Sequence, residues 1–117
     1  MPTNLKITVN EVEPNQDYQI IKFDGEFDKA GHSEIKEQLD KIVLNFNLKA
    51  LIFDFNNLKF INSEGIGYLM EIHTHLVQRD RKLVIIGPNS HVKDVFTTIG
   101  IAEIVPIYNE LNDFLNK

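Results

Sequence analysis

One short stretch decides how this chain folds: Asn62-Ser63-Glu64-Gly65-Ile66-Gly67. Before it lies an apolar run of strand length at residues 50–55, then a polar pair at 56–57 that predicts a turn, and a short apolar return at 58–61. After it, mostly apolar side chains recur at the spacing of one helical face, at Ile66, Leu69, Met70, His73, Leu76 and Val77. The stretch therefore joins a buried strand to a helix, and it places one serine hydroxyl at the junction.

The segments on either side predict an alternation of strands and helices. Alternating side chains at residues 5–9 and a strand-like run at 18–23, joined by a polar loop, predict an antiparallel hairpin. Further strands are expected at residues 51–55, 83–86 and 102–105. Helical spacing predicts four helices, at residues 30–46, 63–78, 92–99 and 108–115, with Gly100 as the cap that ends the third.

Helical crossovers return the chain in the same direction, so the later strands should run parallel to one another. Apolar runs without alternation suit strands that are covered on both faces. We therefore expect an α/β fold. Its mixed sheet has four to five strands, a parallel centre and an N-terminal hairpin, and about four helices cover it. The length of 117 residues predicts a single domain over 1–117.

Composition narrows the classes of partner and chemistry. The net charge is −5, from 17 acidic and 12 basic residues, which argues against a nucleic-acid partner. The chain has no cysteine, which excludes disulfides, thiolate metal sites and cysteine nucleophiles. We find no signal peptide, and no run approaches the roughly 18 apolar residues of a membrane span. These features predict a soluble cytoplasmic protein that acts neither in a membrane nor on nucleic acid.

The acidic cluster at residues 24–28 has the spacing with which a calcium loop begins. Such a loop needs a glycine at its sixth position and a glutamate at its twelfth, where this chain has Lys29 and Ile35. We therefore reject a calcium site and expect a solvated turn that leads into the helix. The histidines give no metal site either, because His73 and His75 stand two apart on a predicted helix and point away from each other. His73 is expected to be a hydrogen-bonded structural residue.

Two catalytic or ligand-binding motifs are incomplete around Ser63. A nucleophile elbow needs a glycine two residues before the serine, and that position is Ile61. The pair Gly65 and Gly67 lacks the further residues of a dinucleotide or P-loop motif, so close packing against the sheet is its expected role. The sequence therefore predicts no enzyme, no cofactor and no metal.

Two roles remain open for Ser63. Either Ser63 or Asn62 can cap the helix, a contribution of about 1 kcal/mol. Yet glycines early in a helix each cost up to about 1 kcal/mol relative to alanine, and two of them leave the hydroxyl unshielded. This weakened opening turn also indicates exposure of the serine or close approach by another molecule.

Three stretches together resemble the STAS domain, the fold of bacterial anti-sigma factor antagonists and of the cytoplasmic tails of sulfate transporters. Residues 23–28 resemble the segment G-E-[LF]-D before the first helix of that family. Residues 51–55 with 60–67 resemble its strand followed by D-S-[ST]-G-[LI]-G. Residues 95–101 resemble its helix end V-x-x-[LF]-x-x-x-G-[LI]. The resemblance extends from the strand at Tyr18 to the closing helix.

The resemblance implies that the protein is an anti-sigma factor antagonist with Ser63 as its phosphoacceptor. An anti-sigma factor that is also a serine kinase would bind the unphosphorylated form and release a sigma factor. Phosphorylation by that kinase would end the binding, and a phosphatase would reset it. Asp28 matches the family's acidic residue near the serine.

The resemblance also implies a partner-binding set, made up of Asp28, Asn62, Ser63, Glu64, Gly65 and Ile66. Asn62 replaces the family's aspartate and Glu64 replaces a small hydroxyl residue, so one negative charge moves across the serine. The expected state is a monomer or weak dimer. Two alternatives stay open: a STAS scaffold that works without phosphorylation, and a small-ligand sensor module.

Overall fold

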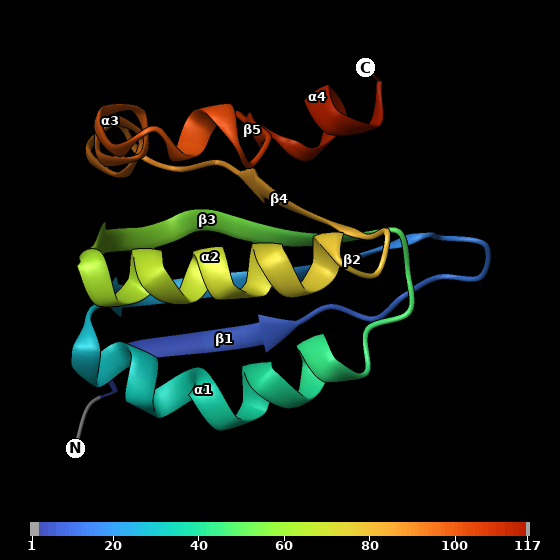
Figure 1. Cartoon of the computed structure of the whole chain (residues 1–117), viewed down its shortest axis with the longest axis horizontal. Coiled ribbons are helices and arrows are strands. Elements are labelled where there is room, and N and C mark those ends of the chain that lie inside the picture. Colours follow the sequence, from blue (N-terminus) through green and yellow to red (C-terminus); the bar gives the residue numbers. More distant parts are fainter. Residues whose placement is uncertain (1–2, 117) are drawn as a thin grey trace.

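Five strands form one sheet in the order β1-β2-β3-β4-β5. The computed structural model describes residues 3–116, so residues 1, 2 and 117 of the expected domain lie outside the described residues. The strands are β1 (Leu5–Val9), β2 (Tyr18–Phe27), β3 (Ala50–Ile61), β4 (Lys82–Ile86) and β5 (Ile107–Tyr108). The helices are α1 (Lys29–Leu44), α2 (Ser63–Val77), α3 (Ser90–Ile99) and α4 (Leu111–Leu115), with a short 3₁₀ helix, η1, at Ile101–Glu103. Figure 1 shows this arrangement.

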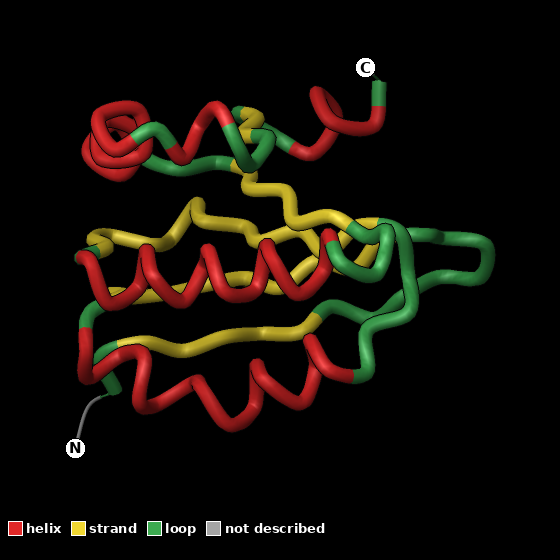
Figure 2. The backbone as a smooth tube through the Cα atoms, in the orientation of Figure 1, coloured by secondary structure: helices red, strands yellow, loops and turns green. Residues whose placement is uncertain are grey.

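The predicted hairpin and parallel centre are confirmed. Strand β1 pairs antiparallel with β2, and the neighbours β2–β3, β3–β4 and β4–β5 are all parallel. The loop between β1 and β2 extends away from the sheet, on the right of Figure 2. It lies at the opposite end of the molecule from the N-termini of α1 and α2.

Strands β2 and β3 continue further than the sequence predicts. The polar residues Asn56 and Asn57 form no turn; β3 runs through them to Ile61. Nor do the acidic residues after Phe23 form a turn, because β2 runs on to Phe27. The two strands pair to their ends through two register shifts in which β3 carries the extra residue. Such bulges accommodate polar residues in a strand that sequence patterns assign to a turn.

The two faces of the sheet have separate apolar clusters. The larger cluster joins the sheet to buried residues of α1, α2 and α3. The smaller one lies on the other face, where Phe114 of α4 packs among Ala50, Ile52, Val84 and Ile86. Helices α1 and α2 therefore cover one face together, with their axes side by side (Figure 1).

The end of the chain differs from the prediction in two places. Residues 102–105 form no strand; Ile101–Glu103 is a 3₁₀ helix, and the last strand is Ile107–Tyr108. Tyr108 thus belongs to a strand, and the closing helix begins only at Leu111. Gly100 ends α3 as predicted, in the left-handed region with φ 83°. Two-residue strands carry no detectable periodicity, which explains the misplaced strand.

Candidate functional site

The ends of β2 and β3 bring two helix N-termini together. Phe27 pairs with Ile61, and the Asn62 amide donates a hydrogen bond to the Phe27 carbonyl at 3.1 Å. Helices α1 and α2 begin within two residues of these positions and start at the same end of the sheet, on the left of Figure 1. Parallel pairing therefore brings the neighbourhoods of Asp28 and Ser63 together.

Asn62, and not Ser63, caps α2. Its side-chain oxygen accepts hydrogen bonds from the backbone N–H groups of Glu64 at 3.0 Å and Gly65 at 3.3 Å. Ser63 is the first residue of the helix and is exposed. Its hydroxyl forms no hydrogen bond with any residue of the part of the chain that the structure describes. The capping role that the sequence left open between two residues belongs to Asn62, and the serine oxygen is available to another molecule.

The two glycines of the opening turn have different roles. A Cβ on Gly65 would stand 2.7 Å from the Phe27 carbonyl oxygen, so this residue lets the helix pack tightly on the sheet as predicted. A Cβ on Gly67 would meet nothing within 4 Å, so the same prediction is wrong there. Gly67 instead lines an open hollow beside Ser63.

This hollow, the Ser63 hollow, has a volume of about 260 Å³. It is lined by His32, Ser63, Glu64, Gly67, Tyr68 and Glu71. His32 comes from α1, and its Nδ1 lies 3.8 Å from a carboxylate oxygen of Glu64. The ring of His32 also packs against the ring of Tyr68, with centroids 4.3 Å apart. Ser63 thus borders a small, mostly acidic surface with one imidazole in it.

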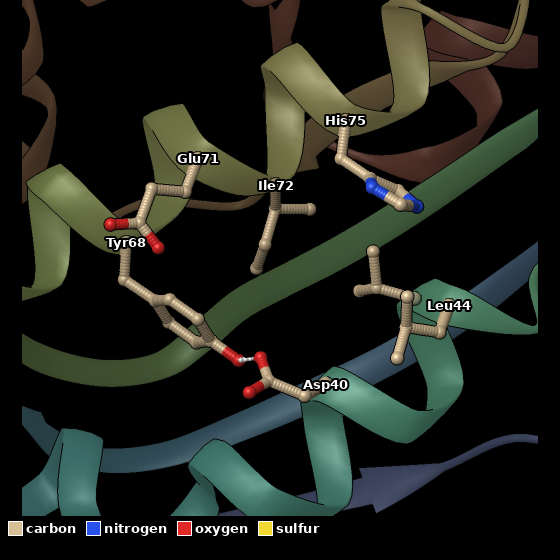
Figure 3. A pocket seen from close by; sticks show the side chains of 7 residues that line it. Asp40, Leu44, Tyr68, Glu71, Ile72 and His75 are labelled. Atoms are coloured by element: carbon tan, nitrogen blue, oxygen red, sulfur yellow. Dashed lines mark hydrogen bonds between the residues drawn. The ribbon is translucent and has the colours of Figure 1, made fainter.

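A polar link between α1 and α2 lies next to the Ser63 hollow. The Tyr68 hydroxyl donates to the Asp40 carboxylate, which also binds the Lys36 ammonium at 2.6 Å. Figure 3 shows Tyr68 pointing from α2 toward Asp40 on α1, beside a second hollow of about 320 Å³. Burial opposes the ionisation of Asp40, but hydrogen bonds from Lys36 and Tyr68 outweigh it and hold the pKa of that carboxyl below its usual value. Burial and the bond to Asp40 raise the pKa of Tyr68.

The other residues expected to contact a partner differ in their accessibility. Asp28 is half-buried and caps α1, where its carboxylate accepts from the Gly31 N–H at 2.8 Å. Glu64 is exposed, Ile66 is half-buried against the core, and Gly65 is buried. A partner arriving at this edge would therefore meet mainly Ser63 and Glu64.

The sequence did not identify His32, Tyr68 and Glu71 as neighbours of Ser63. Tyr68 lies four residues after Glu64, and Glu71 lies four residues after Gly67, so helical spacing from these two residues could have indicated both. The approach of His32 depends on how α1 packs against α2, for which the sequence offers no signal. The expected hydrogen bond of His73 is not present: its buried Nδ1 has no partner among the described residues.

Two further observations concern the chemistry that the described residues place near one another. Within residues 3–116, no group of three His, Cys, Asp or Glu side chains could hold a metal ion. Ser63 forms no hydrogen bond to a histidine, the contact by which a serine nucleophile is activated. No described helix has the length and apolar character that crossing a membrane requires.

Comparison with known proteins assigns the family. The STAS domain model matches residues 9–114. The anti-sigma-B factor antagonist of Listeria monocytogenes is 25% identical over 105 residues, which are 90% of this chain and 91% of that protein. An anti-sigma factor antagonist from Mycobacterium paratuberculosis has a similar structure, with a TM-score of 0.84, 17% identity and coverage of 99% of this chain and 95% of that one.

The phosphorylated form of the Bacillus cell fate determinant SpoIIAA is similar at a TM-score of 0.69 and 16% identity. The similarity covers 95% of this chain and 97% of that one. At these identities the solved structures show a shared fold. The family model extends over nearly the whole chain. The chain belongs to the STAS domain family.

Proposed function

We propose that this chain is an anti-sigma factor antagonist that acts as a single STAS domain. Its unphosphorylated form would bind an anti-sigma factor that is also a serine kinase, and so free a sigma factor. The proposal draws on the Listeria relative, which is named an anti-sigma-B factor antagonist. Its central observation is the exposed Ser63 hydroxyl, which is free because Asn62 supplies the helix cap.

Phosphorylation of Ser63 would be the switch. The kinase transfers the γ-phosphoryl group of ATP to the serine oxygen and releases ADP, and a phosphatase later hydrolyses the ester to inorganic phosphate. The phosphate adds about −1.5 to −2 charges at neutral pH. Because Ser63 does not supply the cap, its modification leaves the hydrogen bonds of Asn62 in place. The fold should therefore persist in both forms.

The effect of the phosphate would fall on the interface. Glu64 and Glu71 already give the Ser63 hollow a negative character. A phosphate dianion there would place like charge against an acidic partner surface. Against an apolar partner surface, it would be a charge without a partner. Such juxtaposition costs several kcal/mol, against a total of about 8 kcal/mol for a micromolar complex. Binding should then be lost.

The test is a pull-down from lysate of the native host with three baits: the unmodified chain, Ser63→Asp and Ser90→Asp. Ser90 is a matched control, because it is the exposed first residue of α3 and follows the capping residue Asn89 as Ser63 follows Asn62. We expect the unmodified chain and Ser90→Asp to retain an ATP-binding serine kinase of the anti-sigma type, and Ser63→Asp to lose it. All three should melt within a few degrees of one another, because a 1 kcal/mol change in the free energy of unfolding corresponds to roughly 2–8 °C in domains of about 60–250 residues.

Equal retention by all three baits would contradict the switch and would favour a scaffold that works without phosphorylation. Mass spectrometry of the chain isolated from its host gives a second test, in which we expect a phosphate on Ser63. A chain that carries no phosphate under any growth condition would contradict the proposal.

A further inference from the structure

The Ser63 hollow offers a phosphate few positive groups. Of the described residues that line it, His32 alone can carry a positive charge, whereas Glu64 and Glu71 are acidic. Lys36 is bound to Asp40 at 2.6 Å and does not line the hollow, and neither does Lys29 in the first turn of α1. A phosphate on Ser63 would therefore lie among carboxylates with one imidazole beside them.

The backbone of α2 offers such a phosphate few donors. A free helix N-terminus binds anions through its unpaired N–H groups. Here the Asn62 side chain already takes the N–H groups of Glu64 and Gly65, and the Asn62 N–H itself donates to the Phe27 carbonyl. The donors that an uncapped helix would offer are largely occupied.

His32 is held in place by contacts with two residues of α2. Its ring packs against Tyr68, and its Nδ1 lies 3.8 Å from the carboxylate of Glu64, the residue next to Ser63. The other ring nitrogen, Nε2, is buried and has no hydrogen-bond partner in the described part of the chain. The polar contact of this ring is therefore made through Nδ1, on the side of Glu64 and the hollow.

We propose that the Nδ1–H of His32 binds the phosphate of phosphorylated Ser63, taking the phosphate as its partner in place of Glu64. This inference rests on the proposed function, because it concerns the modified form of the same serine. A phosphate offers more negative charge than the carboxylate, and hydrogen bonds to charged acceptors are stronger than neutral ones. Phosphorylation would thereby tie the start of α2 to α1 across the hollow.

The test uses the 117-residue chain with phosphoserine installed at position 63 through an expanded genetic code, so no native kinase is needed. The second pKa of the phosphate, about 6 for a free phosphoserine, is followed by ³¹P NMR in three backgrounds: unmodified, His32→Gln and His91→Gln. His91 is the matched control, because it is an exposed histidine on α3 that stacks on Phe60 and does not line the hollow.

We expect the phosphate pKa to be lower with His32 present than in His32→Gln, by about half a unit or more, because a donor to the charged form favours ionisation. His91→Gln should give the value of the unmodified background. An equal phosphate pKa with and without His32 would overturn the proposal. The proposal would also be overturned if His91→Gln raised the phosphate pKa as much as His32→Gln does, because that would show a general effect of charge.

A second measurement does not depend on any variant that might fold poorly. In the chain that keeps both histidines, the ring resonances of His32 should shift when Ser63 is phosphorylated, while those of His91 stay in place. Unmoved His32 resonances would overturn the proposal. Failure of the proposed function has a different signature, because a chain that its host never phosphorylates would still give these titrations.

Discussion

At the scale of single residues, the opening turn of α2 divides its tasks among neighbours. Asn62 caps the helix, Ser63 presents a free hydroxyl, and Gly65 lets the turn pack against the carbonyl of Phe27. At Gly67 a Cβ would meet nothing within 4 Å, and this residue lines the Ser63 hollow. One glycine therefore serves packing, whereas the other lines the hollow without a packing role.

This division predicts opposite effects for two similar substitutions. Gly65→Ala should lower the free energy of unfolding by about 1–3 kcal/mol, because the new methyl group overpacks a tight contact. Gly67→Ala should raise it by up to about 1 kcal/mol, because alanine is the better helix former and the methyl group meets open space. Urea unfolding of both variants measures the difference, and equal changes of one sign would contradict the assignment.

At the scale of elements, α1 and α2 are joined beside the Ser63 hollow by the contacts among Lys36, Asp40 and Tyr68. These contacts stabilise the ionised form of Asp40, whose pKa is lowered from its ordinary value of 3.8. A carboxyl with a lowered pKa in the folded state contributes stability above its unfolded pKa. That contribution is lost as the pH falls through the folded value.

We therefore predict that the contribution of Asp40 to the free energy of unfolding is lost in acid. At about pH 6 Asp40→Asn should be less stable than the unmodified chain, and the gap should narrow as the pH falls from about 4 toward 2. Urea midpoints across that range measure the gap. Asp94→Asn is the control, since Asp94 is an exposed carboxylate on α3 with no ion pair among the described residues. A gap for Asp40→Asn that stays constant with pH would show that its ionisation is not coupled to folding.

At the scale of the whole molecule, the sheet is covered unequally. Helices α1, α2 and α3 build the larger core, whereas the second face has a small cluster closed by α4. Within α4, Phe114 is the buried residue and its neighbour Leu115 is 45% exposed. The short last helix therefore covers the second face through the buried ring of Phe114, with the partly buried Leu111 beside it.

Truncation of that side chain should cost far more than truncation of its neighbour. Phe114→Ala should lower the free energy of unfolding by about 3 kcal/mol, because it removes a buried aromatic ring and leaves a cavity. Leu115→Ala should change it by no more than about 0.5 kcal/mol, as expected at an exposed position. Thermal and urea unfolding compare the two variants. If Phe114→Ala lost as little stability as Leu115→Ala, α4 would contribute little to the second face.

The sequence by itself determined the order of elements, the hairpin and the parallel centre, because hydrophobic periodicity and helical crossovers are local signals. It also placed Asn62 and Ser63 at a strand-to-helix junction. It predicted a turn at 56–57 that does not form and misplaced the last strand, because register shifts and a two-residue strand depend on pairing with neighbours that are distant in the chain. Local patterns do not encode such pairings.

Only the tertiary structure decided which side chains surround Ser63. The choice of Asn62 as the cap follows from the geometry of one turn, and the sequence could narrow it to two residues. The position of His32 follows from the packing of α1 against α2, which is set by buried residues along both helices and not by the motif around the serine. The candidate site is thus local in its serine and cap but tertiary in its charged neighbours, because side chains on two helices meet only after both have packed on the sheet.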